Sequence, residues 1–148
     1  MNLIECVKNL LSKDEYMDEF NGVHIDYTDN SNENTGLFLT SDNKLKEDVL
    51  GGMTRKATFT IYRNVYNATD SERIQNSTFI LGLSAYLESL ENTDIQFDYF
   101  IGKNEKRNAY ITKIECSNGM LFKYLNGNPG MGAQYMLQLT VNYEVNPE

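Results

Sequence analysis

The stretch Tyr135-Met136-Leu137-Gln138-Leu139-Thr140-Val141-Asn142-Tyr143 decides the fold, because tyrosines and aliphatic residues occupy every second position. Successive side chains of a β-strand point to opposite faces of a sheet, so the pattern predicts a strand over residues 134–145 with one buried face. Residues 56–66 repeat the pattern, with Ala, Phe and Ile on one face and threonines on the other. Together the two stretches predict a sheet with one face turned toward a core.

Shorter runs predict the remaining strands. We expect strands over residues 23–27, 37–40 and 95–99, where apolar and polar residues alternate or β-formers cluster. Two further strands, 110–116 and 120–125, are predicted to form a hairpin across Ser117-Asn118-Gly119. Asn-Gly between two alternating runs is a strong signal for such a tight turn.

Two helices are predicted. Residues 2–13 place their apolar side chains on one helical face. Thr69-Asp70-Ser71-Glu72 fits a capping box, which predicts a long helix from there to about Leu90. We expect a broad apolar face of this helix to pack across the sheet. That face is expected to contain Ile74, Thr78, Phe79, Leu81, Leu83, Ala85, Tyr86, Leu87 and Leu90.

Three segments are predicted to be loops. Residues 41–52 are polar, mixed in charge and end in two glycines, so we interpret 41–55 as a mobile loop or arm. Residues 102–108 form a basic turn, and 126–132 a glycine-rich loop. Strands grouped around helices predict one α+β domain over residues 1–148, a mainly antiparallel sheet packed by an N-terminal helix and one long central helix.

Composition excludes several classes of protein. The 148 residues carry 13 Lys and Arg against 21 Asp and Glu, a net charge of −8 that disfavours binding to a phosphate backbone. We expect no signal peptide and no membrane span, and therefore synthesis in a cytoplasm. Cys6 and Cys116 lie far apart in the sequence and are interpreted as buried thiols rather than a disulfide.

Motifs for catalysis are missing from the sequence. His24 is the single histidine, and no phosphate-binding loop, dinucleotide fingerprint or nucleophile elbow occurs. We therefore predict no catalytic, metal-binding or cofactor-binding residues. An enzyme that uses His24 with a cysteine remains an open alternative.

Four stretches of the chain, in order, resemble the tail-terminator family of long-tailed bacteriophages, proteins also called minor capsid proteins. They are Asp48-Val49-Leu50-Gly51-Gly52, the strand over 57–66, the helix over 72–90 and the alternating stretch 135–143. The resemblance covers almost the whole chain. It implies an α+β sandwich of sheet and helices.

The resemblance also implies a structural role in virion assembly, in a phage or in a phage-tail-like bacteriocin. A ring, usually of six copies, would cap the tail tube, stop its polymerisation and dock the filled head. The implied partners are other copies of the chain, the tail tube protein and a head-completion protein. DNA would pass through the ring without specific binding, and no membrane would be involved. The protein would lie in the host cytoplasm and then at the head–tail junction.

A ring requires heterologous contacts that close, and long loops on a rigid sheet are suited to making them. We predict such contacts in the loops 41–55 and 126–132 and in the basic turn. The candidate contact residues are Lys44, Lys46, Met53, Arg55, Lys103, Arg107, Asn128 and Met131. Two other classes remain open: a head–tail connector or head-completion protein, and a monomeric binding module unrelated to phages.

Overall fold

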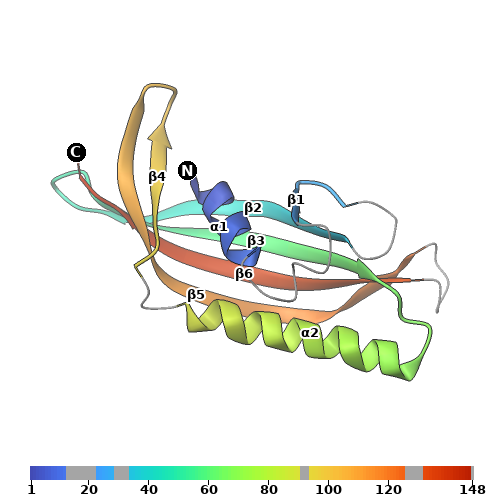
Figure 1. The fold of residues 1–148 in the computed structure, drawn as a ribbon. Coiled ribbons are helices and arrows are strands. Elements are labelled where there is room, and N and C mark those ends of the chain that lie inside the picture. The colour runs from blue at the N-terminus through green and yellow to red at the C-terminus, as the bar shows by residue number, and fades with distance from the viewer. Residues whose placement is uncertain (13–22, 29–33, 91–93, 126–131, 148) are drawn as a thin grey trace.

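A computed structural model describes residues 1–12, 23–28, 34–90, 94–125 and 132–147. The elements are α1 (Leu3–Ser12), β1 (Val23–Ile25), β2 (Asn34–Glu47), β3 (Met53–Val65), α2 (Asp70–Ser89), β4 (Gln96–Ile101), β5 (Glu105–Tyr124) and β6 (Ala133–Val145). The six strands form one curled sheet in the order β1-β2-β3-β6-β5-β4 (Figure 1). Only the β1–β2 pair is parallel. The predicted α+β class agrees with this architecture in its coarse features, a mixture of helices and strands with a mainly antiparallel sheet.

β6, the last of the described strands, lies in the middle of the sheet. β6 pairs with β3 on one side and with β5 on the other. Leu137, Leu139, Val141 and Tyr143 are each at most 1% exposed, as the alternation predicts. Phe59 of β3 is also completely buried opposite Leu139. The two stretches that predicted the sheet therefore form its core.

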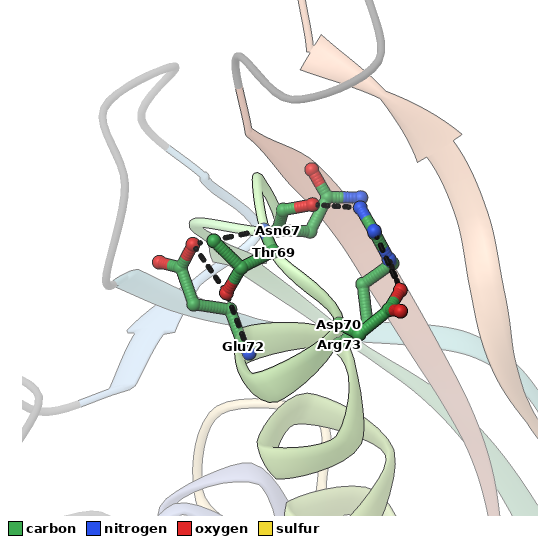
Figure 2. Close-up of polar contacts among 5 residues, drawn as sticks. All are labelled: Asn67, Thr69, Asp70, Glu72 and Arg73. Atoms are coloured by element: carbon green, nitrogen blue, oxygen red, sulfur yellow. Dashed lines mark hydrogen bonds and ion pairs between the residues drawn. The ribbon is translucent and has the colours of Figure 1, made fainter.

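The predicted capping box begins α2 (Figure 2). The Thr69 hydroxyl accepts a hydrogen bond from the Glu72 amide at 3.2 Å, and the Glu72 carboxylate accepts one from the Thr69 amide at 3.2 Å. Arg73 bonds the Asn67 carbonyl and the Asp70 carboxylate, each at 2.7 Å. The two capping-box bonds pair backbone amides that have no partner within the helix, and the Arg73 bonds tie the first turn to the preceding segment.

The apolar face of α2 differs from the predicted one. Phe79, Ile80, Leu83 and Leu87 are buried and belong to one hydrophobic cluster with the strands and α1, but the predicted members Ile74 and Leu81 are 66% and 71% exposed. Thr78 and Ala85, which were also predicted to pack on the sheet, are exposed as well. The prediction for these four residues was wrong because the helix carries two apolar stripes. Helical spacing shows both stripes, but it does not show which of them meets the sheet.

The predicted hairpin at Asn118-Gly119 does not exist. β5 runs through both residues as one strand, and its register against β6 shifts between Ser117 and Met120 by one extra residue. Asn118 takes a left-handed φ of 56°, so the dipeptide forms a β-bulge instead of a turn. A Cβ on Gly119 would lie 2.7 Å from Cγ2 of Ile80. Glycine at this position therefore permits close approach between β5 and α2.

The predicted loop or arm 41–55 is also largely strand. Residues 41–47 continue β2 opposite β3, residues 53–55 begin β3, and only 48–52 form the connecting turn. Polar side chains on this stretch reflect an edge strand exposed to solvent, not a loop. The basic turn is shorter than predicted as well, because β5 begins at Glu105 and contains two of its basic residues. The predicted loop 126–132 falls almost entirely outside the described residues.

Candidate assembly surfaces

Five predicted contact residues lie at one end of the sheet, where β2 and β3 meet. Lys44 and Lys46 are on β2, opposite Arg55 and Thr54 of β3, and Met53 begins β3. Arg107 of β5 reaches the same end through a hydrogen bond to the β2–β3 turn. In Figure 1 this hairpin end projects beyond the helices, near the C-terminus.

The other three predicted contacts are not part of this group. Lys103 lies in the turn between β4 and β5, and this hairpin end bends away from the other strands in Figure 1. Asn128 and Met131 lie outside the described residues.

Asp48 organises the turn between β2 and β3. Its carboxylate oxygen Oδ1 accepts hydrogen bonds from the amides of Leu50 and Gly52, both at 2.9 Å. The Asp48 amide donates to the Gly52 carbonyl at 2.8 Å, which closes the turn. Gly51 takes a φ of 92°, a conformation that favours glycine. The turn thus has a defined conformation built from its own residues.

Arg107 fixes the turn to the body of the sheet. Its Nη1 donates to the Gly51 carbonyl at 2.9 Å, and its Nη2 lies 3.4 Å from the Glu105 carboxylate. The guanidinium is mostly buried, with 17% of the side chain exposed. A buried, charged donor on a turn carbonyl is among the stronger hydrogen bonds in proteins. The hairpin end is therefore held from the β5 side.

The fixed turn presents apolar side chains to solvent. Val49 is 101% exposed and Leu50 is 76% exposed, and Leu45 on the adjacent strand is 55% exposed. Neither Val49 nor Leu50 is buried against the chain itself, although each occupies an ordered turn. Exposed aliphatic groups on an ordered turn are typical of contact surfaces, because a partner can cover them with little loss of conformational entropy. We name Val49 and Leu50 the hairpin tip.

A polar cluster lies at the base of this hairpin. The Tyr143 hydroxyl donates to Asp42 at 2.8 Å, and Arg55 Nη2 lies 3.2 Å from the same carboxylate. Arg55 also lies 5.6 Å from the ring centre of Tyr99. Burial and the hydrogen bond to Asp42 raise the pKa of Tyr143 strongly. Burial alone would lower the pKa of Arg55, but hydrogen bonds to Asp42 and Tyr143 outweigh it and raise that pKa. Tyr143 and Arg55 therefore keep their protons at neutral pH. Their contacts with Asp42 link β2, β3 and β6 at the base of the hairpin.

The remaining candidates for chemistry lie on different elements. His24 is exposed on β1, and the thiol of Cys6 is buried on α1. Burial raises the pKa of the Cys116 thiol to about 11, so this thiol is protonated and weakly nucleophilic at neutral pH. Among the described residues, no group of three or more His, Cys, Asp or Glu side chains could hold a metal ion. No helix of the described segments has the length and apolar character to span a membrane.

Sequence reasoning missed the residues that organise this end. Asp42, Asp48 and Tyr143 were not predicted as site residues, although Asp48 before two glycines is a signal for a capped turn. The hairpin tip lies within the predicted contact segment 41–55, but Val49 and Leu50 were not among the predicted contact residues. Most of the predicted contact residues are basic, because Lys and Arg are conspicuous in an acidic chain.

Comparison with known proteins adds no family. No protein-family model matches the chain, and no curated protein matches it.

Proposed function

We propose that this chain is a structural virion-assembly protein of the tail-terminator type. A ring of copies, six in the form we propose, caps the tail tube, stops its polymerisation and offers the docking surface for the head. The chain performs no catalysis in this role and needs no cofactor. It acts first in the host cytoplasm and then at the head–tail junction.

The single observation that carries this proposal is the ordered hairpin tip. Val49 and Leu50 are almost entirely exposed, yet Asp48 and Arg107 hold their turn in one conformation. A ring of identical copies needs one surface that meets a different surface on the next copy. The hairpin tip is suited to be the first of these surfaces, and it lies in the loop that the sequence assigned to ring contacts.

The proposal includes a finer description of the fold, in which α1 and α2 cover one face of the sheet. The Tyr86 hydroxyl donates to the Leu10 carbonyl at 3.0 Å, which links the two helices. The close approach of Ile80 to Gly119 supports a helix layer directly on β5. The uncovered face of the sheet, with partly exposed polar residues such as Gln138 and Asn142 of β6, is then free to line a channel.

Charge supports a conduit through which DNA passes without specific binding. The chain carries a net charge of −8, and several such copies around a channel repel a phosphate backbone. Tail tube and head-completion proteins are the partners that we propose on either side of the ring.

The test uses particles produced with and without this gene, viewed by negative-stain microscopy. The gene is then supplied as wild type, as the double variant Val49→Ser with Leu50→Ser, or as the matched control Ile74→Ser, which changes an exposed aliphatic residue of α2. Loss of the gene should give tails of uncontrolled length beside full, unattached heads. The tip variant should reproduce that phenotype, and the control should restore normal particles.

Two outcomes would contradict the proposal. Tails of normal length with leaking or empty heads would assign the protein to a connector or head-completion role. Unaltered particles without the gene would exclude a role in virion assembly. Circular dichroism of the purified tip variant separates a lost contact from a lost fold, because both substituted side chains are exposed.

A further inference from the structure

Beyond the hairpin tip, the sheet has a long unpaired edge on β5. β4 covers β5 only as far as Tyr110, and among the described residues no strand pairs with that side of residues 112–124. Large apolar side chains accumulate along this edge. Their exposed fractions are 51% for Met120, 37% for Leu121, 50% for Phe122 and 41% for Tyr124.

The opposite edge of the sheet, formed by β2 beyond its pairing with β1, is protected from pairing with another strand. The contrast with β5 indicates that the β5 edge has a partner. Beyond its short pairing with β1, the β2 edge has charged residues, among them Lys44 and Lys46. Proteins use charges of this kind to prevent unwanted strand pairing. β5 itself has three register irregularities against β6, one of them at Asn118-Gly119, so the two edges differ in charge and not in bulges. The β5 edge has only one charged residue between Cys116 and Tyr124. An apolar, unpaired edge is the surface to which another strand adds.

We propose that β5 pairs antiparallel with β5 of a second copy of this chain, around a two-fold axis close to Gly119. The contact is isologous and joins the two sheets into one. An axis perpendicular to the joined sheet keeps both α2 helices on the same side, where they lie antiparallel to each other.

The charges of β5 are arranged for this axis. Glu115 lies four residues before Gly119, and Lys123 lies four residues after it. Both project from the same face of the sheet. Their partners on β6, Thr140 and Gln134, are an even number of residues apart and therefore share one face. The axis therefore brings each Lys123 opposite Glu115 of the second copy. Glu115 already pairs with Lys113 at 2.7 Å, so the added lysine completes a small network.

The same axis places complementary residues of the two α2 helices opposite each other. We call this line of residues the α2 seam, and residues 115–123 of β5 the β5 seam. Arg73 and Glu88 are equally distant from the midpoint between Ile80 and Leu81, and so are Ser77 and Ser84. In an antiparallel pair of α2 helices, Arg73 of one copy meets Glu88 of the other, with small serines between them. Small side chains allow two helices to lie close together.

One contact places the two seams on a common axis. Ile80, at the centre of the α2 seam, lies directly beside Gly119, at the centre of the β5 seam. Tyr86 is on the other side of the helix and bonds α1. The Arg73–Glu88 side of α2 therefore faces the unpaired edge of β5.

Net charge favours this surface over the rest of the molecule. Two copies that each carry a charge of −8 repel at most orientations. No charged residue occurs from Ile74 to Leu87 of α2 or from Cys116 to Phe122 of β5. Depletion of charge in the centre, with charged pairs at the ends, is the pattern of a contact surface.

The dimer does not rest on the proposed ring. The ring uses heterologous contacts at the hairpin tip, whereas the dimer uses one surface twice at the β5 edge.

Sedimentation equilibrium of the purified full chain tests the pairing. The wild type should be dimeric at about 100 µM, and Lys123→Glu should raise the dissociation constant about tenfold or more. Glu115→Lys should do the same, and the double variant with both changes should restore dimerisation because the pair is only exchanged. Lys103→Glu, an equal change of charge on a distant turn, should leave the dimer intact.

Disulfide formation tests the axis itself. Leu81→Cys places a thiol beside the axis, and Ile74→Cys places one at similar exposure but far from it. With Cys6 and Cys116 changed to serine, oxidation should link the Leu81→Cys chains as dimers and leave the Ile74→Cys chains unlinked.

A wild type that stays monomeric at that concentration, a dimer insensitive to both single reversals, or equal linking of the two cysteine variants would each overturn the proposal. Rings that still form from Lys123→Glu chains would leave the proposed function intact.

Discussion

Substitution of Gly119 by alanine tests the packing of α2 on β5. A Cβ at this position would lie 2.7 Å from Cγ2 of Ile80 and 3.3 Å from Cδ1 of Leu137. Carbon atoms in contact prefer about 3.5–4.0 Å, so the Ile80 methyl group must move by about 1 Å. Ile80 is branched at Cβ, and its γ2 methyl group cannot move away by rotation of a flexible chain end.

The expected loss combines two opposing effects. Overpacking of a core contact costs about 2 kcal/mol, whereas alanine in place of glycine stabilises by about 0.7 kcal/mol through the unfolded state. Gly119 does not have a left-handed φ, so alanine adds no backbone strain. Gly119→Ala should therefore lower the free energy of unfolding by about 1 kcal/mol.

Urea unfolding followed by circular dichroism at low protein concentration measures this change. A double-mutant cycle with Ile80→Ala isolates the contact, because Gly119→Ala should cost nothing once the γ2 methyl group is absent. A Gly119→Ala variant as stable as the wild type would refute the reasoning. An equal cost in both backgrounds would place the strain somewhere other than Ile80.

Three further changes should have local effects. Thr69→Ala removes the α2 cap and should cost about 1 kcal/mol in urea unfolding, whereas Ser71→Ala, which removes no bond of the capping box, should cost much less; equal losses would argue against the cap. Arg107→Ala frees the Gly51 carbonyl and should speed amide exchange in residues 48–52 by about tenfold, an effect that Lys103→Ala should lack. Cys116, with a pKa of about 11, should react with a thiol reagent at pH 8 about 100-fold more slowly than a free cysteine. Because the folded state retains this proton, stability should fall as the pH rises above 9; a rate equal to that of free cysteine would contradict the burial.

Elements with local causes could be predicted from the sequence. The capping box specifies where α2 begins through residues three positions apart, and the alternation of β6 reflects its own buried face. The stretch Asn118-Gly119 shows the limit, because the same dipeptide serves a hairpin or a bulge. Contact with Ile80, which lies 39 positions earlier, accompanies the bulge, and no local pattern contains that contact.

Of the candidate site, the sequence predicted the basic side chains but not the bonds that order the turn. Basic residues were conspicuous in the sequence, and the structure groups four of them, Lys44, Lys46, Arg55 and Arg107, with Met53 at the β2–β3 end of the sheet. The bond from Arg107 to Gly51 joins positions 56 residues apart, so the ordering of the turn followed from the fold alone. Residues 41–47 were assigned to a loop because an edge strand that faces solvent has the composition of a loop.

The central place of β6 has a consequence for synthesis on the ribosome. β3 leaves the exit tunnel long before β6, its neighbour across 13 paired positions. Until β6 emerges, the apolar faces of β3 and β5 have no common partner, and the halves of the sheet cannot join. Folding of the sheet therefore waits for β6, and premature termination before β6 should yield a product that chaperones or proteases capture.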